Sequence, residues 1–316
     1  MNVAQHCTVA DGVLNVNKET GWTSHDVVAK VRHLLGGVKV GHAGTLDPMA
    51  TGVLPVLIGR GTRIAEYLVE WDKEYEAILR LGETTDTQDA TGTVLIRRSI
   101  EGLTAEAIHE VAARFCGPVE QVPPMYSAVK VGGVPLYKAA RAGKTIAREA
   151  RTVVLHILEV RAIQGRDVTL RVVCSKGTYV RTLCADMGEA LGVGGHLLSL
   201  VRTRVGPFSL DRALTVEAFA TRHALGQLGE VLHSLDHVLD QLPCVEIDDR
   251  TADRVKHGVP VPAEKVVFRH ETAARVKPGT PVRIHDSQGR LVAIGRSAES
   301  QSQPIPIEKV LTGQDS

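Results

Sequence analysis

The residues best suited to chemistry gather in one short segment, GHAGTLDPMATGVLPVLIGRGTR, which covers positions 41–63. Its five glycines permit left-handed backbone angles or a close approach of the backbone to a ligand. Asp47 stands before Pro48, which favours an extended conformation at Asp47, and an apolar run over 53–58 follows. A carboxylate on such a restrained loop can be presented rigidly, and carboxylates act as nucleophiles or proton acceptors.

The residues of this segment alone are compatible with two other interpretations. A P-loop that cradles phosphate is also rich in glycine, but it ends in Gly-Lys-Ser/Thr, which this segment lacks. A turn-forming or helix-capping role for Asp47 stays open, because aspartate is common in both settings.

Two other parts of the chain can supply partners for Asp47. Tyr75 lies in a predicted strand over 74–81, and Arg181 follows an apolar strand and begins a predicted helix. An arginine in this position can pair with a buried carboxylate and keep it ionised. Taken singly, Tyr75 and Tyr179 remain compatible with ordinary core or surface positions.

A basic segment covers positions 125–151, MYSAVKVGGVPLYKAARAGKTIAREAR. Its six basic residues are Lys130, Lys138, Arg141, Lys144, Arg148 and Arg151. Glu149 is its only acidic residue, so the local net charge is +5 in an otherwise balanced chain. Such a segment suits phosphate binding, and Tyr126 and Tyr137 add surfaces on which bases can stack. A solvated helix face followed by a loop is the alternative on charge alone.

Three predicted helices and several strands must position these residues. Helices are expected after a cap at Thr23 or Ser24, after a cap at Thr104, and over 181–191. Each is followed within a few residues by glycine. Strands are expected over 74–81, 152–163 and 168–174, with a hairpin-length connection between the last two. Adjacent strands joined by short turns indicate a mixed α+β fold with a largely antiparallel sheet.

A second region begins after Pro243 and contains only short apolar runs. They cover 266–268, 281–284, 291–294 and 305–307, and a turn signal separates the second run from the third. This spacing predicts a small β-barrel of about 70 residues.

Composition places the chain among ordinary globular proteins. Its 316 residues suffice for about two domains, and 43% are hydrophobic. The net charge of +1 neither demands nor excludes a nucleic-acid partner. Five cysteines form no C-x-x-C pair, so neither a zinc ribbon nor a disulfide framework is indicated. We expect no membrane span and no signal peptide, which favours the cytoplasm.

The segment 41–63 closely resembles the catalytic motif of the bacterial tRNA pseudouridine-55 synthases, the TruB family. Four further stretches match this family in order and spacing: 12–21, 82–89 with Asp89, 124–130 and 174–182. The resemblance covers residues 11–210, and extends more loosely over 244–311 to the PUA-type RNA-binding barrel of the family. It implies the pseudouridine synthase fold and isomerisation of uridine 55 in the T-arm of tRNA, with neither metal nor organic cofactor.

The resemblance also assigns roles to individual residues. Asp47 matches the essential aspartate, Arg181 the arginine that pairs with it, and Tyr75 the tyrosine that stacks on the target base. The implied substrate-binding residues are His42, Tyr179, Leu200, Lys18 and Lys130. The basic segment 125–151 matches the RNA-clamping insertion of the bacterial enzymes.

The resulting domain prediction has four parts. Residues 1–10 form an N-terminal extension, 11–243 the catalytic domain, 244–311 the PUA-like domain and 312–316 a tail. We expect a monomer that binds tRNA without a guide RNA. A guide-RNA-dependent relative of the fold, and a non-catalytic RNA-binding or tRNA-folding protein on the same scaffold, are the alternatives.

The reaction must break an N-glycosidic bond, turn the base and form a carbon–carbon bond from C5. The base must leave its stack for this, at a cost of a few kcal/mol. An ionised Asp47 can attack C1′ to give a glycosyl ester, or remove the 2′ proton to give a glycal. The sequence leaves both routes open.

Overall fold

The computed structural model describes residues 11–312, apart from 128, 142, 269–275 and 301. The largest element of the fold is a ten-stranded sheet with the main order β14-β1-β3-β12-β4-β11-β10-β7. Outside this order, β2 pairs with β3 and β13 pairs with β12. These strands are β1 (Gly12–Lys18), β2 (Val40–His42), β3 (Thr51–Ile58), β4 (Lys73–Leu81), β7 (Gly117–Gln121), β10 (Arg151–Gln164), β11 (Asp167–Cys174), β12 (Gly195–Val205), β13 (Phe208–Ser209) and β14 (Leu232–His233). The predicted, largely antiparallel sheet is therefore confirmed.

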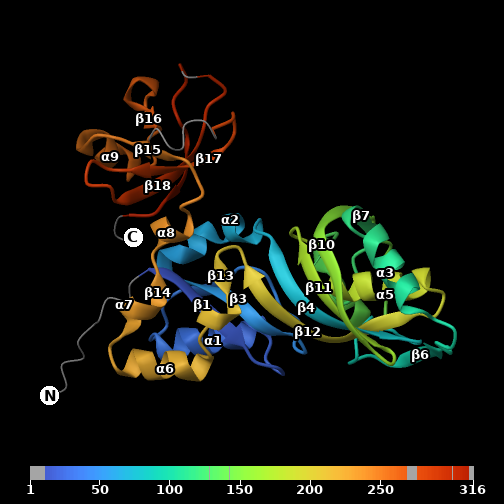
Figure 1. The fold of residues 1–316 in the computed structure, drawn as a ribbon. Coiled ribbons are helices and arrows are strands. Elements are labelled where there is room, and N and C mark those ends of the chain that lie inside the picture. Colours follow the sequence, from blue (N-terminus) through green and yellow to red (C-terminus); the bar gives the residue numbers. More distant parts are fainter. Residues whose placement is uncertain (1–10, 128, 142, 269–275, 301, 313–316) are drawn as a thin grey trace.

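Helices cover the two ends of this sheet. They are α1 (Ser24–Leu34), α2 (Ala65–Val69), α3 (Ala105–Arg114), α4 (Leu136–Arg141), α5 (Val180–Ala190), α6 (Val216–Ala224), α7 (Leu228–Val231) and α8 (Leu235–Val238). Figure 1 shows α3 and α5 beside β10 and β11 at one end of the sheet, and α1 and α6 beside β1 at the other. The active-site candidates lie on strands and loops and, for Arg181, in the first turn of α5.

The helix signals of the sequence correspond to real caps. The side chain of Thr23 accepts a hydrogen bond from the backbone N–H of Asp26, and Asp26 accepts one in return, which completes a capping box. Thr104 caps α3 in the same way through the N–H of Ala107. The predicted helix over 181–191 is α5, one residue earlier at both ends. All three predicted helices are confirmed.

The junction between β3 and β12 is the one parallel pairing described in the large sheet. Here Arg202 is paired with Gly52, whose φ is +104°. A Cβ atom at Gly52 would lie 2.2 Å from the carbonyl oxygen of Arg202. Only glycine fits this junction, because the obstacle is backbone and the conformation disfavours other residues.

We therefore expect Gly52→Ala to lower the free energy of unfolding by about 3 kcal/mol or more, through a backbone clash added to strain. Gly165→Ala is the matched control, since Gly165 has a φ of +61° and open space around its Cβ position. It should cost about 1 kcal/mol. Urea unfolding of both variants measures the difference, and equal losses would contradict this account of the junction.

The C-terminal region forms a separate, smaller sheet of the order β16-β15-β17-β18-β19. Its strands are β15 (Cys244–Glu246), β16 (Val267–Phe268), β17 (Pro281–His285), β18 (Leu291–Arg296) and β19 (Ile307–Val310), accompanied by α9 (Asp249–Val255). The predicted closed barrel is wrong for the described residues. The edge strands β16 and β19 do not pair with each other, and β16 has only two residues with which to extend the sheet.

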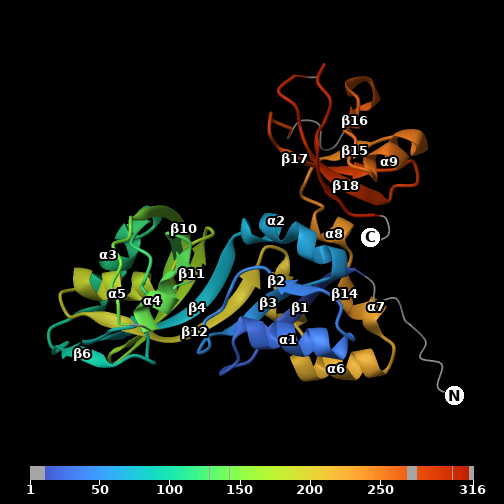
Figure 2. The same cartoon turned by 180° about the vertical axis from the view of Figure 1, so that it is seen from behind.

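The smaller sheet is tied to the region of the large sheet through side chains from both. Arg283 and His285 on β17 both contact Asp236 of α8, at 2.7 and 2.8 Å. The Tyr67 hydroxyl donates to Glu308 at 2.9 Å. Figure 2 shows the small sheet attached at the α2 and α8 side of the large one. Within the described residues, no helix is long and apolar enough to span a membrane.

Two short hairpins project from the large sheet. One pairs β5 (Glu83–Thr85) with β6 (Val94–Arg97), and the other pairs β8 (Lys130–Val131) with β9 (Val134–Pro135). The second hairpin and α4 lie within the basic segment 125–151, where the side chains of Lys138 and Lys144 are exposed. This segment therefore presents positive charge to solvent, as its sequence predicts. Residues 1–10 and 313–316, which hold the predicted extension and most of the predicted tail, lie outside the described residues.

Candidate active site

The loop that carries Asp47 joins β2 to β3 and is anchored to its neighbours by hydrogen bonds. The Ser24 hydroxyl at the start of α1 accepts from the N–H of Leu46 at 2.9 Å and donates to its carbonyl at 3.2 Å. The buried ammonium of Lys18, at the end of β1, donates to the carbonyl of Pro48 at 3.3 Å. These contacts on both sides of Asp47 hold its backbone in place, as the sequence predicts for a restrained loop.

Arg181 pairs with Asp47 across 134 positions of sequence. Its Nε lies 2.9 Å from Oδ2 of Asp47, and its Nη2 lies 3.5 Å from Oδ1. The Arg181 side chain is only 5% exposed, whereas 36% of the Asp47 side chain is exposed. The carboxylate is thus held from one side by a buried, two-point charge contact while remaining accessible to a substrate.

A second carboxylate, Asp89, lies on another side of the same guanidinium. Its Oδ2 lies 3.7 Å from Nη1 of Arg181, and its side chain is 6% exposed. The other oxygen, Oδ1, accepts hydrogen bonds from the hydroxyl of Thr87 at 2.7 Å and from the hydroxyl and N–H of Thr91 at 2.6 and 3.0 Å. Asp89 is therefore fixed by its own loop and directs its free oxygen toward Arg181.

The pKa of Asp47 depends on opposing effects, since some of its surroundings favour the neutral carboxyl and others favour the ionised carboxylate. Burial raises the pKa of the Asp47 carboxyl, and the negative charge of Asp89 adds to that rise. Arg181 and Lys18 oppose it, yet the net direction is upward. Burial lowers the pKa of Lys18 to about 8, although the charge of Asp47 supports its protonated form. Asp47 thus depends on these cations for its negative charge.

Tyr75 and Leu200 line the same face of the sheet. Tyr75 on β4 is opposite Arg202 on β12, and Leu200, two residues before Arg202, is opposite Ala77. Because side chains alternate along a strand, residues two apart share a face. Tyr75 is 9% exposed, burial raises the pKa of its hydroxyl, and its phenol interacts electrostatically with Asp47. The structure therefore brings both residues to the Asp47 side of the sheet.

Tyr179 precedes α5 and is anchored to strand β7. Its backbone N–H and carbonyl are both bonded to the side-chain amide of buried Gln121, at 3.0 and 3.3 Å. Burial raises the pKa of the Tyr179 hydroxyl. Arg181 connects α5 to the basic segment by donating to the carbonyl of Tyr126 at 2.7 Å. The start of α5 and the root of the basic segment are therefore fixed together beside Asp47.

Two family models match the part of the chain that carries this site. Residues 32–180 match the model described as TruB family pseudouridylate synthase (N terminal domain). Residues 181–240 match the model described as tRNA pseudouridylate synthase B C-terminal domain. The chain belongs to the TruB family of pseudouridylate synthases. The matched regions contain every residue of the Asp47 site described above except Lys18 and Ser24.

Curated relatives extend the TruB match to nearly the whole chain. A protein of Burkholderia mallei (strain NCTC 10247) named tRNA pseudouridine synthase B is 44% identical over 305 residues, which are 96% of this chain and 98% of that protein. A protein of Stutzerimonas stutzeri (strain A1501) with the same name is 42% identical over 291 residues, 91% and 92% of the two chains. The chain thus spans nearly the full length of these relatives.

Solved structures share the architecture as well. The chain in the archaeal box H/ACA sRNP Nop10-Cbf5 complex has a TM-score of 0.74 at 27% identity, over 97% of this chain and 88% of that one. A Cbf5-Nop10-Gar1 complex gives 0.74 at 30% identity, over 95% and 85%. The TruB chain therefore shares its fold with proteins solved as parts of larger assemblies.

His42 and Lys130 are two further predicted substrate-binding residues. His42 ends β2, with its ring 5.7 Å from that of His25, and burial lowers the pKa of His42 to about 4. Its Nδ1 atom is buried with no partner among the described residues. His42 is therefore neutral near pH 7 and holds an unused polar atom. Lys130 begins β8, and its side chain lies outside the described part of the structure.

Two residues of the site were not assigned a role from the sequence. Asp89 stands in a recognised stretch, GETTDTQDATG, but nothing in that stretch shows that its carboxylate faces Arg181. Arg202 is 1% exposed and lies opposite Tyr75 on the neighbouring strand. The available signal for Arg202 was an arginine that directly follows the largely apolar run over 197–201, since a buried charge requires nearby partners.

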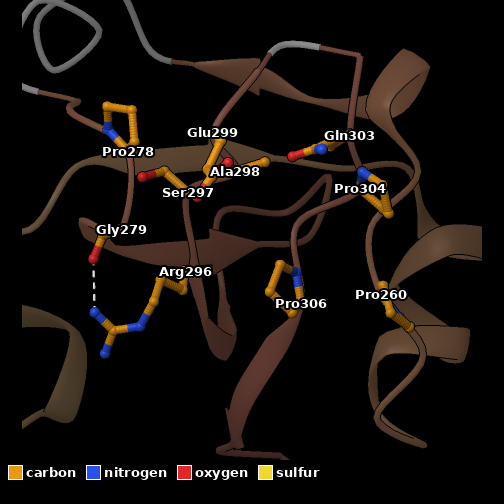
Figure 3. Close-up of a pocket in the computed structure, with 10 residues that line it drawn as sticks. All are labelled: Pro260, Pro278, Gly279, Arg296, Ser297, Ala298, Glu299, Gln303, Pro304 and Pro306. Carbon is orange, nitrogen blue, oxygen red and sulfur yellow. Dashed lines mark hydrogen bonds between the residues drawn. The ribbon is translucent and has the colours of Figure 1, made fainter.

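We also considered metal sites and other cavities of the chain as candidate sites for the reaction. Among the described residues, no group of three or more His, Cys, Asp or Glu side chains is arranged to hold a metal ion. A groove of about 640 Å³ opens on the C-terminal domain, and Figure 3 shows its walls. Its lining residues are Pro260, Pro278, Gly279, Arg296, Ser297, Ala298, Glu299, Gln303, Pro304 and Pro306. Its lone cation Arg296 already donates to the carbonyl of Gly279 and pairs with Glu308, so this groove is no candidate for the reaction.

The raised pKa of Asp47 predicts the acid side of the pH dependence. Only the ionised carboxylate can act as nucleophile or base, so the rate should fall as the pH falls through that raised pKa. The half-maximal point should therefore lie above 3.8, the usual value for aspartate. Single-turnover rates on tRNA from pH 4.5 to 8 measure it. A rate that stays constant to pH 4.5 would contradict the prediction.

Proposed function

We propose that this chain converts uridine 55 in the T-arm of tRNA to pseudouridine. The observation that carries the proposal is the accessible Asp47 carboxylate, held 2.9 Å from buried Arg181 in a chain of the TruB family. The names of the curated relatives, tRNA pseudouridine synthase B, support tRNA as the substrate. Position 55 follows from the family resemblance of the segment 41–63.

The proposed reaction balances without an added reactant. The N1–C1′ bond of the uridine breaks, the uracil turns within the site, and a C5–C1′ bond forms. C5 then loses its proton, and N1 gains one. Asp47 acts on the sugar, either at C1′ or at the 2′ proton, while Arg181 keeps it ionised. In this proposal Tyr75 stacks on the uracil, and Tyr179 and Leu200 supply walls that keep water from the reacting carbon.

The RNA must be opened before this chemistry, and the basic segment 125–151 is suited to hold it. Its exposed lysines can contact phosphates, and its root is bonded to Arg181 beside Asp47 through the carbonyl of Tyr126. Neutral His42 and buried Lys18 complete the substrate-binding set, together with Lys130. Phosphate contacts of this kind make tRNA binding weaken as salt is raised.

We assign the rest of the chain by the same reasoning. Residues 11–243 form the catalytic domain and 244–311 a PUA-like RNA-binding domain. The stretch 244–316 contains 11 basic and 10 acidic residues, so its contact with RNA is modest. We propose a monomer in the cytoplasm that acts without a guide RNA. The presence of the basic segment supports this proposal, because it gives the chain its own means of gripping RNA.

Mapping of pseudouridine in an unmodified tRNA transcript tests the function. We expect the protein alone to produce pseudouridine at position 55, and none in a transcript with cytidine at that position. Formation at other positions only would overturn the assignment of position 55. Tight tRNA binding without any pseudouridine would favour the alternative, a non-catalytic tRNA-folding protein.

A further inference from the structure

Gln121 is a buried amide that the proposed reaction does not use. It is the last residue of β7 and is 2% exposed. Its side-chain oxygen accepts a hydrogen bond from the backbone N–H of Tyr179 at 3.0 Å, and its side-chain nitrogen donates to the carbonyl of Tyr179 at 3.3 Å. An amide oxygen only accepts and an amide nitrogen only donates, so this pairing fixes the direction of the side chain. Gln121 therefore holds the backbone of one residue at two points.

The residue that Gln121 holds is the one from which α5 begins. Tyr179 is the N-cap of this helix, and its own side chain makes no capping hydrogen bond. Its carbonyl also accepts the backbone N–H of Leu183 at 3.0 Å, which is the first bond of the helix. Arg181 follows two residues later, and its Nε lies 2.9 Å from Oδ2 of Asp47. Because the geometry of a helical turn is fixed, a shift of Tyr179 moves Arg181 relative to Asp47.

Gln121 also lies where the chain leaves the large sheet to form the basic segment 125–151. The chain departs from the sheet after Gln121 and returns to it at Arg151, and these two residues are directly opposite each other on β7 and β10. Arg148 adds a second connection between the two sides by donating to the carbonyl of Pro123 at 3.2 Å. The basic segment therefore projects from a closed pair of strands, and Gln121 joins the base of this projection to the start of α5.

We propose that Gln121 is a positioning residue for the isomerisation, which holds the start of α5 so that Arg181 meets Asp47. The Arg181 side chain is buried and also donates to the carbonyl of Tyr126 at 2.7 Å, so it has little freedom to compensate for a displaced helix. A misplacement of about 1 Å can lower an enzymatic rate about 100-fold. This inference rests on the proposed function and adds to it a residue that is too deeply buried to touch the RNA.

Gln121→Met in the full chain tests the proposal, because methionine has a similar length but cannot make the two hydrogen bonds. The readouts are the single-turnover rate of C5-tritium release between pH 4.5 and 8, and the Kd for tRNA. We expect the rate at pH 7 to fall about 30-fold, with the Kd within about 3-fold of wild type. A displaced Arg181 supports the Asp47 carboxylate less, while Asp89 and Lys18 keep their effects, so the pKa of Asp47 rises further. The acid limb of the pH profile should therefore move to higher pH.

Asn15→Leu is the matched control. Asn15 on β1 is also a buried amide, 3% exposed, and its side-chain nitrogen donates to the carbonyl of Ser209 at 2.9 Å. Urea unfolding should show a loss of stability in both variants, whereas Asn15→Leu should keep the wild-type rate and acid limb.

An unchanged rate in Gln121→Met would overturn the proposal. A lower rate with the acid limb in its wild-type position would also overturn it, and so would a loss in tRNA affinity alone. If Gln121→Met does not fold, Gln121→Asn decides, because its shorter side chain cannot reach both groups of Tyr179, and a wild-type rate and acid limb would overturn the proposal. Absence of release by the wild-type protein would instead overturn the proposed function.

Discussion

Replacing Asp47 by asparagine should lower pseudouridine formation by about 10⁴-fold or more, with tRNA affinity within a few-fold of wild type. The amide has nearly the shape of the carboxylate, so the loop anchored by Ser24 and Lys18 should persist. It offers neither a nucleophilic oxygen for C1′ nor a base for the 2′ proton. The variant removes one of the two carboxylates beside Arg181, and Asp89 remains as a negative neighbour of that cation. Rates from pseudouridine mapping and a filter-binding Kd measure the two effects separately.

The control for this variant is Asp253→Asn in α9. Asp253 is an exposed aspartate that pairs with Lys256 at 2.8 Å in the C-terminal domain. It should retain the full rate. An Asp47→Asn variant with more than about a tenth of the wild-type rate would mean that another group does the chemistry. Loss of tRNA binding in that variant would mean that Asp47 holds the RNA instead.

The second large effect is expected at Arg181. Arg181→Met should lower the single-turnover rate about 10³-fold, because two carboxylates then face each other without the cation between them. The pKa of Asp47, already raised by burial and by Asp89, should rise further when the opposing charge is lost. The rate at pH 7 falls for that reason, and the acid limb of the pH profile moves to higher pH.

This upward shift separates an electrostatic role from a structural one. Arg181→Lys keeps a positive charge but loses the two-point contact with Asp47. It should restore part of the rate and return the acid limb toward its wild-type position. An Arg181→Met profile with the wild-type acid limb would contradict the account. Thermal unfolding of both variants shows whether loss of the contact with Tyr126 also weakens the fold.

Local signals explain which elements were predictable. The helix α1 is predictable because Thr23 and Ser24 are both suitable N-cap residues and glycines follow its last turn. The hairpin of β10 and β11 was foreseen from two β-branched runs around a short turn. The restraint of the Asp47 loop was also anticipated, from its glycines and Pro48. Each of these signals acts within about ten residues of the chain.

Long-range pairing accounts for what was missed. Strand β12 was not predicted, and its parallel pairing with β3 places Arg202 against Gly52 and opposite Tyr75. Nothing near Arg202 in sequence indicates these partners, which lie about 130 to 160 positions away. The closed C-terminal barrel failed for a related reason. Short apolar runs predict strands but do not state whether the edge strands meet.

Release of tritium from C5-labelled uridine in unmodified tRNA is the most direct test of the central claim. The C5 hydrogen must leave when C5 becomes the atom bound to the sugar, so release reports the isomerisation itself. We predict release by the wild-type protein and none by Asp47→Ala. Equal release by both would show that the reaction is right and the role of Asp47 wrong. No release by either, with tRNA still bound, would contradict the enzymatic account.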